Sequence, residues 1–183
     1  MVKFKLPNTA RSVDMLNRIC FALVFVFLVV PAISAQVRQP ATSARTYVVK
    51  KSQQVAEIQK MLAQKTGNVN EDIVAAAGEQ TRVAIFRDAK RENDLNEIHD
   101  NSDDIYYVLL GEATLMLGGT LVGANEVSPG EWRAKEAVGG EKVVIRKGDL
   151  IFIPRGTRHQ RTVAGKAFEM ILIKVFADRQ PLK

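Results

Sequence analysis

The spacing of hydrophobic residues changes along the chain, and the first regular pattern after residue 50 has helical spacing. In the segment KSQQVAEIQKMLAQKTG, four apolar residues recur on one side of a helix and a glycine ends the pattern: Val55, Ile58, Met61, Leu62 and Gly67. This pattern predicts an amphipathic helix whose apolar side packs on the rest of the protein.

A second, shorter helix is predicted from Glu71 to Ala77. Asn70 precedes the segment as a candidate N-cap, and Gly78 follows it as a candidate stop. We interpret both helices as packing elements of the core rather than as functional surfaces.

After Gly78 the apolar residues alternate with polar ones, and β-branched and aromatic residues become frequent. Segments with period-two spacing between glycine-rich turns predict strands. These segments are Arg82–Phe86, Leu95–His99, Ile105–Leu110, Ala113–Leu117, Thr120–Val122, Lys142–Ile145, Leu150–Ile153, His159–Val163 and Phe168–Phe176. Many short strands without helices between them indicate a mainly β protein, either an antiparallel sandwich or a closed barrel.

The first 35 residues have a different composition from the rest. Four basic residues precede the apolar run ICFALVFVFLVV (Ile19–Val30), and Pro31 and a small-residue stretch ending at Ala35 follow it. This order is typical of a secretory signal peptide. The run of twelve apolar residues is shorter than the roughly 20 residues of a membrane-spanning helix. We therefore predict cleavage near Ala35, export to the periplasm or the exterior, and no membrane association afterwards.

Removal of this leader would change the cysteine count and the charge. Cys20 is the only cysteine and lies inside the leader, so the exported chain would have neither disulfides nor thiol chemistry. The leader carries a net charge of +3 out of the total of +6, which leaves about +3. Because the remaining Lys and Arg are scattered among Asp and Glu, the charge gives no ground for nucleic-acid binding.

The two histidines of the chain lie in two separate segments that predict one site. Glu97 and His99 are two residues apart on a predicted strand, which places both side chains on one face. Asp104 follows an Asn-Ser-Asp turn, and the strand that comes next can bring it back close to Glu97 and His99. In GDLIFIPRGTRHQ, a proline and Gly156 form a turn that delivers His159 at the start of a strand.

These two segments resemble the two motifs of the cupin superfamily, G-x5-H-x-H-x3-4-E-x6-G and G-x5-P-x-G-x2-H-x3-N. The second motif matches from Gly148 through Pro154, Gly156 and His159, with Val163 in place of the final Asn. In the first motif, Gly111 sets the register. Asp104 then stands where the family has Glu, and His99 and Glu97 stand where it has two histidines.

The resemblance, which covers roughly residues 81–175, implies a cupin double-stranded β-helix, or jelly-roll barrel, with a metal or small ligand inside. Together with the leader and the helices predicted above, this divides the chain into 1–35 signal peptide, 36–80 linker and N-terminal helices, and 81–177 barrel. The implied ligands are His99, His159, Glu97 and Asp104, with Glu97 replacing a histidine of the usual set. Two imidazoles with carboxylates suit Mn, Fe or Zn, and the oxygen ligands favour Mn(II) or Fe(II).

Alternatives remain open for the carboxylates of this site. Asp104 could cap the turn, and Asp103 could take its place as a ligand. Glu97 could pair with an arginine at the barrel mouth and bind no metal.

Two further residues are candidates for substrate contact. The segment Gly118–Lys147 contains six glycines and Pro129, which predicts a looped insertion near the barrel mouth. Its Trp132 could bind a sugar or an aromatic ring, or could pin the loop to the barrel. Arg158, beside His159, could meet an anionic substrate or could be a solvated charge in the turn.

Two classes of function follow from these residues. The first is a metal-dependent enzyme, of oxygenase or isomerase type, that acts on a small organic acid, phenol or sugar derivative. The second is a non-catalytic module that binds a small ligand or another protein. In either class, a homodimer formed through the outer sheet is possible, and the sequence assigns no catalytic residue.

Overall fold

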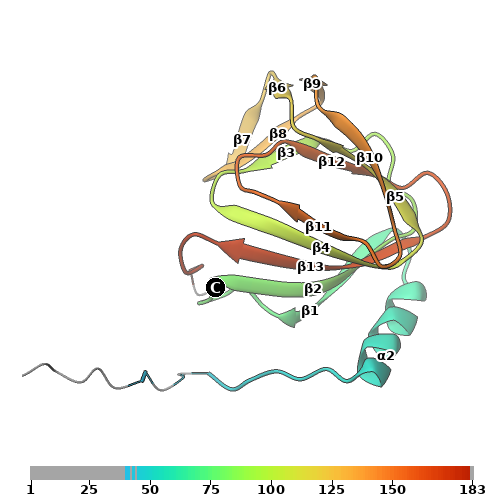
Figure 1. Ribbon diagram of the computed structural model, residues 1–183, viewed down its shortest axis with the longest axis vertical. Helices are drawn as coiled ribbons and strands as arrows, with labels where there is room; N and C mark the ends of the chain where they lie inside the picture. The colour runs from blue at the N-terminus through green and yellow to red at the C-terminus, as the bar shows by residue number, and fades with distance from the viewer. Residues whose placement is uncertain (1–39, 42, 44, 182–183) are drawn as a thin grey trace, which may run out of the picture. The chain divides into compact units, whose positions relative to one another are not determined.

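Helix α2 (Ser52–Ala63) is the first regular element of the computed structural model, which describes residues 40, 41, 43 and 45–181. It confirms the first predicted helix. The side chain of Gln54 accepts a hydrogen bond from the backbone N–H of Lys51 at 2.9 Å, which satisfies one donor at the helix start. Leu62 is fully buried, and the helix contacts β1 (Asn68–Val74) and β2 (Thr81–Asp88) (Figure 1).

The predicted helix at Glu71–Ala77 is wrong, because these residues belong largely to strand β1. Strand β1 pairs antiparallel with β2, and Val69, Glu71 and Ile73 are partly buried while the residues between them are exposed. This alternation is that of a strand at the edge of a sheet. A helix of seven residues would be marginal without extensive packing, whereas the strand gains a ladder of backbone hydrogen bonds with β2.

Two antiparallel sheets face each other and form the predicted jelly roll (Figure 1). The first has the order β1-β2-β13-β4-β11 and adds β13 (Phe168–Phe176), β4 (Ser102–Leu110) and β11 (Leu150–Ile153). The second has the order β10-β5-β12-β3-β8-β7. Its strands are β10 (Glu141–Arg146), β5 (Glu112–Leu117), β12 (His159–Thr162), β3 (Asn96–His99), β8 (Glu131–Ala134) and β7 (Asn125–Ser128).

The hydrophobic core fills one part of the space between the sheets. It includes Tyr106, Leu115, Ile145, Phe168 and Met170, all nearly inaccessible to solvent. Each predicted strand coincides with a strand of the structure, which confirms the predicted strands. Among the described residues, no helix has the length and apolar character that crossing a bilayer requires.

The segment Gly118–Lys147 contains more strands than the predicted looped insertion allowed. Besides β10 and β6 (Thr120–Val122), which the alternating pattern predicted, it forms β7, β8 and β9 (Glu136–Val138), and β9 pairs with β6. Glycines make the turns between these strands, as at Gly130, where φ is +75°. The high Gly content thus reflects hairpin turns, and β8 extends the second sheet beside β3.

The predicted signal peptide, residues 1–35, lies outside the described residues.

Candidate metal centre

Strand pairing brings the two histidines together from distant parts of the chain. His159 on β12 lies directly opposite Glu97 on β3 in the antiparallel ladder. Glu97 and His99 share a face of β3, as their spacing predicted, and Asp104 reaches the same space from β4 in the facing sheet. The two imidazole ring centroids are 5.0 Å apart.

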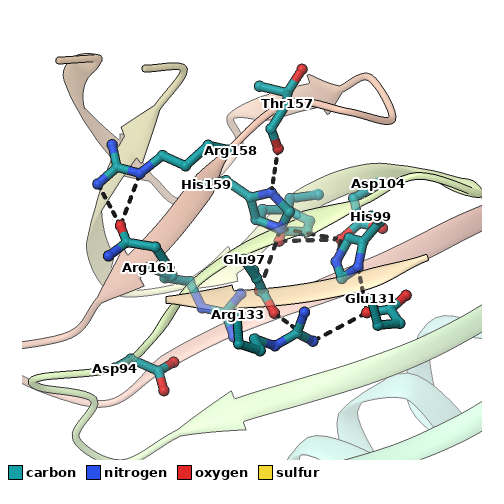
Figure 2. A network of polar contacts seen from close by, with 12 residues as sticks. Asp94, Glu97, His99, Asp104, Glu131, Arg133, Thr157, Arg158, His159 and Arg161 are labelled. Carbon is teal, nitrogen blue, oxygen red and sulfur yellow. Dashed lines mark hydrogen bonds and ion pairs between the residues drawn. The ribbon is translucent and has the colours of Figure 1, made fainter. Parts of the chain in front are cut away.

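The nitrogen and oxygen atoms of these side chains converge on one point (Figure 2). One ligand atom from each of Glu97, His99 and His159 lies within 4.8 Å of the others. The Nε2 atoms of His99 and His159 are 3.6 and 3.8 Å from Oδ2 of Asp104. Ligands of one ion, each about 2.1 Å from it, lie within about 4.2 Å of one another, so small side-chain movements would suffice for binding.

Hydrogen bonds fix the tautomer of both histidines. Nδ1 of His159 donates to the backbone carbonyl of Thr157 at 3.0 Å, and Nδ1 of His99 donates to Oε2 of Glu131 at 2.6 Å. Each ring therefore turns the lone pair of Nε2 toward the shared centre. A carbonyl or carboxylate that holds the second nitrogen in this way is the usual outer partner of a metal-bound histidine.

The donor atoms of this centre fit a cation. Nε2 of His159 is buried and has no hydrogen bond of acceptable geometry, although Oε1 of Glu97 is 3.3 Å away. A lone pair that faces carboxylate oxygens at this distance is repelled by them. A proton on the ring nitrogen or a metal ion between the groups would remove the repulsion, so the residues present fit a divalent metal.

Charges around the centre keep its glutamates ionised. Burial alone would raise the pKa of Glu97, but His159 and His99 in their protonated, metal-free form, together with Arg133, outweigh it and hold that pKa well below its usual range. Nη2 of Arg133 is 3.0 Å from Glu97 and 3.2 Å from Glu131. For Glu131, burial is likewise outweighed, chiefly by His99, and the pKa is lowered. Arg133 therefore connects the carboxylate of Glu97 to that of Glu131, which orients His99.

Asp104, rather than its neighbour Asp103, faces the centre. Asp104 is buried, and its Oδ1 is 2.6 Å from Nζ of Lys174, so one side of its carboxylate is already neutralised. Asp103 points away and accepts hydrogen bonds from the backbone and side chain of Arg155, which lower its pKa to about 2. The two adjacent aspartates are thus on opposite faces of β4.

Three residues of the site were absent from the sequence prediction. Glu131 and Arg133 alternate with Trp132 and Ala134 on β8, so period-two spacing was the available signal. Lys174 is the one charge in the apolar stretch ILIKVF of β13, which was a signal for a functional or paired residue.

The two predicted substrate contacts do not line the cavity beside the centre. The guanidinium of Arg158 extends away from the imidazoles (Figure 2) and bonds the side chain of Asn96 and the carbonyl of Gly118. Trp132 lies on the outer face of β8, where its Nε1 donates to Asp100 at 2.6 Å. Both side chains fasten neighbouring strands or turns to each other.

One comparison with a solved structure bears on the fold. No protein-family model matches the chain, and no curated protein matches it. A solved structure of a cupin superfamily protein from Desulfitobacterium hafniense is 15% identical, with a TM-score of 0.50, and the match covers 73% of this chain and 99% of that one. The similarity shows that this chain has the cupin fold, as its motifs predicted.

Other solved structures match with lower TM-scores. KdgF from a Halomonas species is 16% identical over 61% of this chain and 82% of that one, with a TM-score of 0.42. A predicted oxalate decarboxylase from Thermotoga maritima is 20% identical over 53% of this chain and 68% of that one, with a TM-score of 0.38.

Proposed function

We propose that this protein binds one divalent metal ion inside the barrel through His99, His159 and Glu97, with Asp104 beside them. The observation that supports the proposal most is the shared tautomer of the histidines. Both rings have Nδ1 occupied by an acceptor and Nε2 directed to a point that the carboxylates also face. Two imidazoles with one or two carboxylates suit Fe(II), Mn(II) or Zn(II).

We further propose that the centre serves a metal-dependent reaction on a small organic acid, phenol or sugar derivative. A bound metal of this kind supplies Lewis-acid or oxygen-binding chemistry. The chain itself supplies a cavity of about 230 Å³ beside the centre, with Phe86, Met170 and Leu172 on its wall. Arg133 pairs with Glu97 beside this cavity and keeps it ionised and in place.

Metal content tests the proposal directly. Wild-type protein that is treated with chelator, reloaded separately with Mn(II), Fe(II) or Zn(II) and desalted should retain about one ion per chain. His99→Ala, His159→Ala and Glu97→Gln should each lose most of it. Glu112→Gln is the matched control, because Glu112 is an exposed carboxylate that pairs with Arg146. Stoichiometric metal that survives both histidine substitutions would contradict the assignment.

A second candidate, a non-catalytic module that binds a small ligand without metal, also has support. Arg133 pairs with Glu97 and Lys174 pairs with Asp104, so both carboxylates already have cationic partners. A barrel of this kind would show the same melting temperature in chelator and in each metal. A metal-binding protein would instead gain stability as the free metal rises above its dissociation constant.

We also propose that the protein is exported, because residues 1–35 have the order of a signal peptide. Mass spectrometry of the protein from a periplasmic or secreted fraction should give an N-terminus near Gln36. An intact Met1 or Val2 terminus in the mature, active pool would contradict this.

A further inference from the structure

A second hollow in the surface adjoins the inner cavity. The outer hollow has a volume of about 660 Å³ and is lined in part by Asp72, Ser128 and Phe176. The inner cavity and the outer hollow share three lining residues: Arg82, Glu131 and Lys174. A ligand that enters through the outer hollow would therefore pass these residues before it meets the imidazoles.

Lys174 has an ammonium group with unused hydrogen-bonding capacity at this boundary. It projects from β13 on the inner face, and its side chain is only 12% exposed. Nζ contacts Oδ1 of Asp104 at 2.6 Å and donates to Oγ of Ser102 at 3.2 Å. An ammonium has three donors, so one remains for a ligand.

Arg82 offers a second cation nearer the opening. Its Nε donates to Asp72 at 2.9 Å, and its Nη2 donates to Asn70 at 3.0 Å. Its guanidinium carbon lies 5.4 Å from the centre of the Phe86 ring. The side chain is thus fixed in position, while Nη1 makes no hydrogen bond to any described residue.

The cationic groups of the inner wall favour one of the three substrate classes. Its polar lining consists of arginine, lysine, histidine, carboxylates and the hydroxyl of Tyr106, with no Asn, Gln, Ser, Thr or Trp among the lining residues. Sugar hydroxyls are commonly bound by side-chain amides, and the lining residues of this wall include none. A metal ion at the centre would add two positive charges, which favours a ligand that brings negative charge.

We infer that the substrate of the proposed metal centre is a small carboxylic acid, and that Lys174 and Arg82 bind its carboxylate groups. This inference rests on the proposed function, and it narrows the substrate to one class. The inner volume of about 230 Å³ equals nearly eight water volumes of about 30 Å³ each, which is room for a short dicarboxylic acid. Asp104 is then a positioning residue, because it holds the ammonium of Lys174 at the inner cavity.

Malonate and its neutral diamide, malonamide, provide a matched pair of probes. We expect metal-loaded wild-type protein to bind malonate at least about tenfold more tightly than malonamide in calorimetric titration, because charge-assisted hydrogen bonds are the stronger ones. Lys174→Met should weaken malonate binding at least about tenfold, and Lys174→Arg should weaken it less. Lys142→Met is the control, since Lys142 is exposed on β10.

Arg82→Gln keeps the test decisive if Lys174→Met fails to fold, because Arg82 is partly exposed and its loss leaves no buried charge without a partner. We expect this variant to lose malonate affinity severalfold at unchanged metal content. Equal affinity for malonate and malonamide, or wild-type affinity in both the Lys174 and the Arg82 variants, would overturn the inference. Metal content is measured first on every sample. A wild-type protein without metal refutes the metal centre, whereas a loaded protein that binds no malonate refutes only the substrate class.

Discussion

The two histidines reach the same point from regions that hold them in different ways. His159 follows the turn Pro154–Thr157, and its Nδ1 bonds the carbonyl of Thr157, only two residues away. His99 lies on β3, and its Nδ1 bonds the carboxylate of Glu131, which is 32 residues away on β8. The imidazole of His159 is thus oriented by the neighbouring main chain. The imidazole of His99 is oriented by the side chain of Glu131, which lies beside it only because β8 pairs with β3.

This difference separates a local part of the centre from a long-range part. A backbone carbonyl cannot be removed by substitution of its side chain, so the orientation of His159 resists mutation at Thr157. The orientation of His99 depends on Glu131, and Glu131 in turn contacts Arg133, the partner of Glu97. A change on β8 should therefore affect two of the three proposed ligands.

The largest expected contrast is between Glu131→Gln and Thr157→Ala. Loss of the carboxylate that orients a ligand histidine typically lowers metal affinity by about 10- to 100-fold, and we expect this for Glu131→Gln. The metal affinity of Thr157→Ala should stay within about twofold of that of wild type, because the backbone carbonyl of residue 157 remains. Competitive titration of Zn(II) or Mn(II) against a chelating dye measures both. Equal affinities in the two variants would show that the Glu131 contact does not orient His99.

The same contrast explains which parts of the site the sequence could predict. The turn before His159 has a short signature of proline and glycine, and Glu97 and His99 are two residues apart on one strand, so local rules were sufficient for both. Glu131 faces His99 only because β8 pairs with β3 in one register. Register depends on tertiary pairing, and the Gly and Pro content around β8 indicated a loop instead.

Prediction of the fold from the sequence was limited in the same way. The alternating strands from Arg82 onward were predictable because burial of one face imposes period two. Residues 71–77 carried plausible cap residues at both ends, yet pairing with the edge of β2 made residues 68–74 a strand. Local propensity is a weak guide where a sheet edge offers a ladder of hydrogen bonds.

Substitution of two glycines should reveal a smaller difference, in stability, between the turn before His159 and the start of β8. Gly156 in the turn before His159 and Gly130 just before Glu131 both have positive φ, +76° and +75°. An added Cβ at Gly156 meets nothing within 4 Å, whereas at Gly130 it would lie 2.5 Å from the Asn101 amide. We expect Gly156→Ala to cost about 1–2 kcal/mol in the free energy of unfolding, from backbone strain alone, and Gly130→Ala to cost more.

Urea unfolding in the presence of chelator measures both glycine variants without a contribution from metal. Gly130→Ala should also weaken metal binding, because it displaces the start of β8. A Gly156→Ala variant that is less stable than Gly130→Ala would indicate that the turn before His159, rather than β8, is the more constrained region.

The smallest expected effect is on the free energy of unfolding at low pH. It concerns Asp103, which supports the turn before His159 through Arg155. Asp103 bonds the backbone and side chain of Arg155, and its pKa falls from 3.8 to about 2 in the folded protein. The unfolded chain therefore binds this proton first as the pH falls, so the stabilisation is complete above pH 3.8 and is lost toward pH 2. Asp103→Asn should flatten the decline of unfolding free energy in this window.

The comparison for that experiment is Glu136→Gln, which removes an exposed carboxylate on β9 far from the turn in sequence. Urea unfolding at pH 5 and at pH 2.5, in chelator, should show a smaller pH-dependent loss for Asp103→Asn than for wild type or Glu136→Gln. Because the pair with Arg155 is partly exposed, added salt should shrink the difference. Parallel declines in all three proteins would mean that Asp103 does not stabilise the turn, and that the main chain alone holds His159 in place.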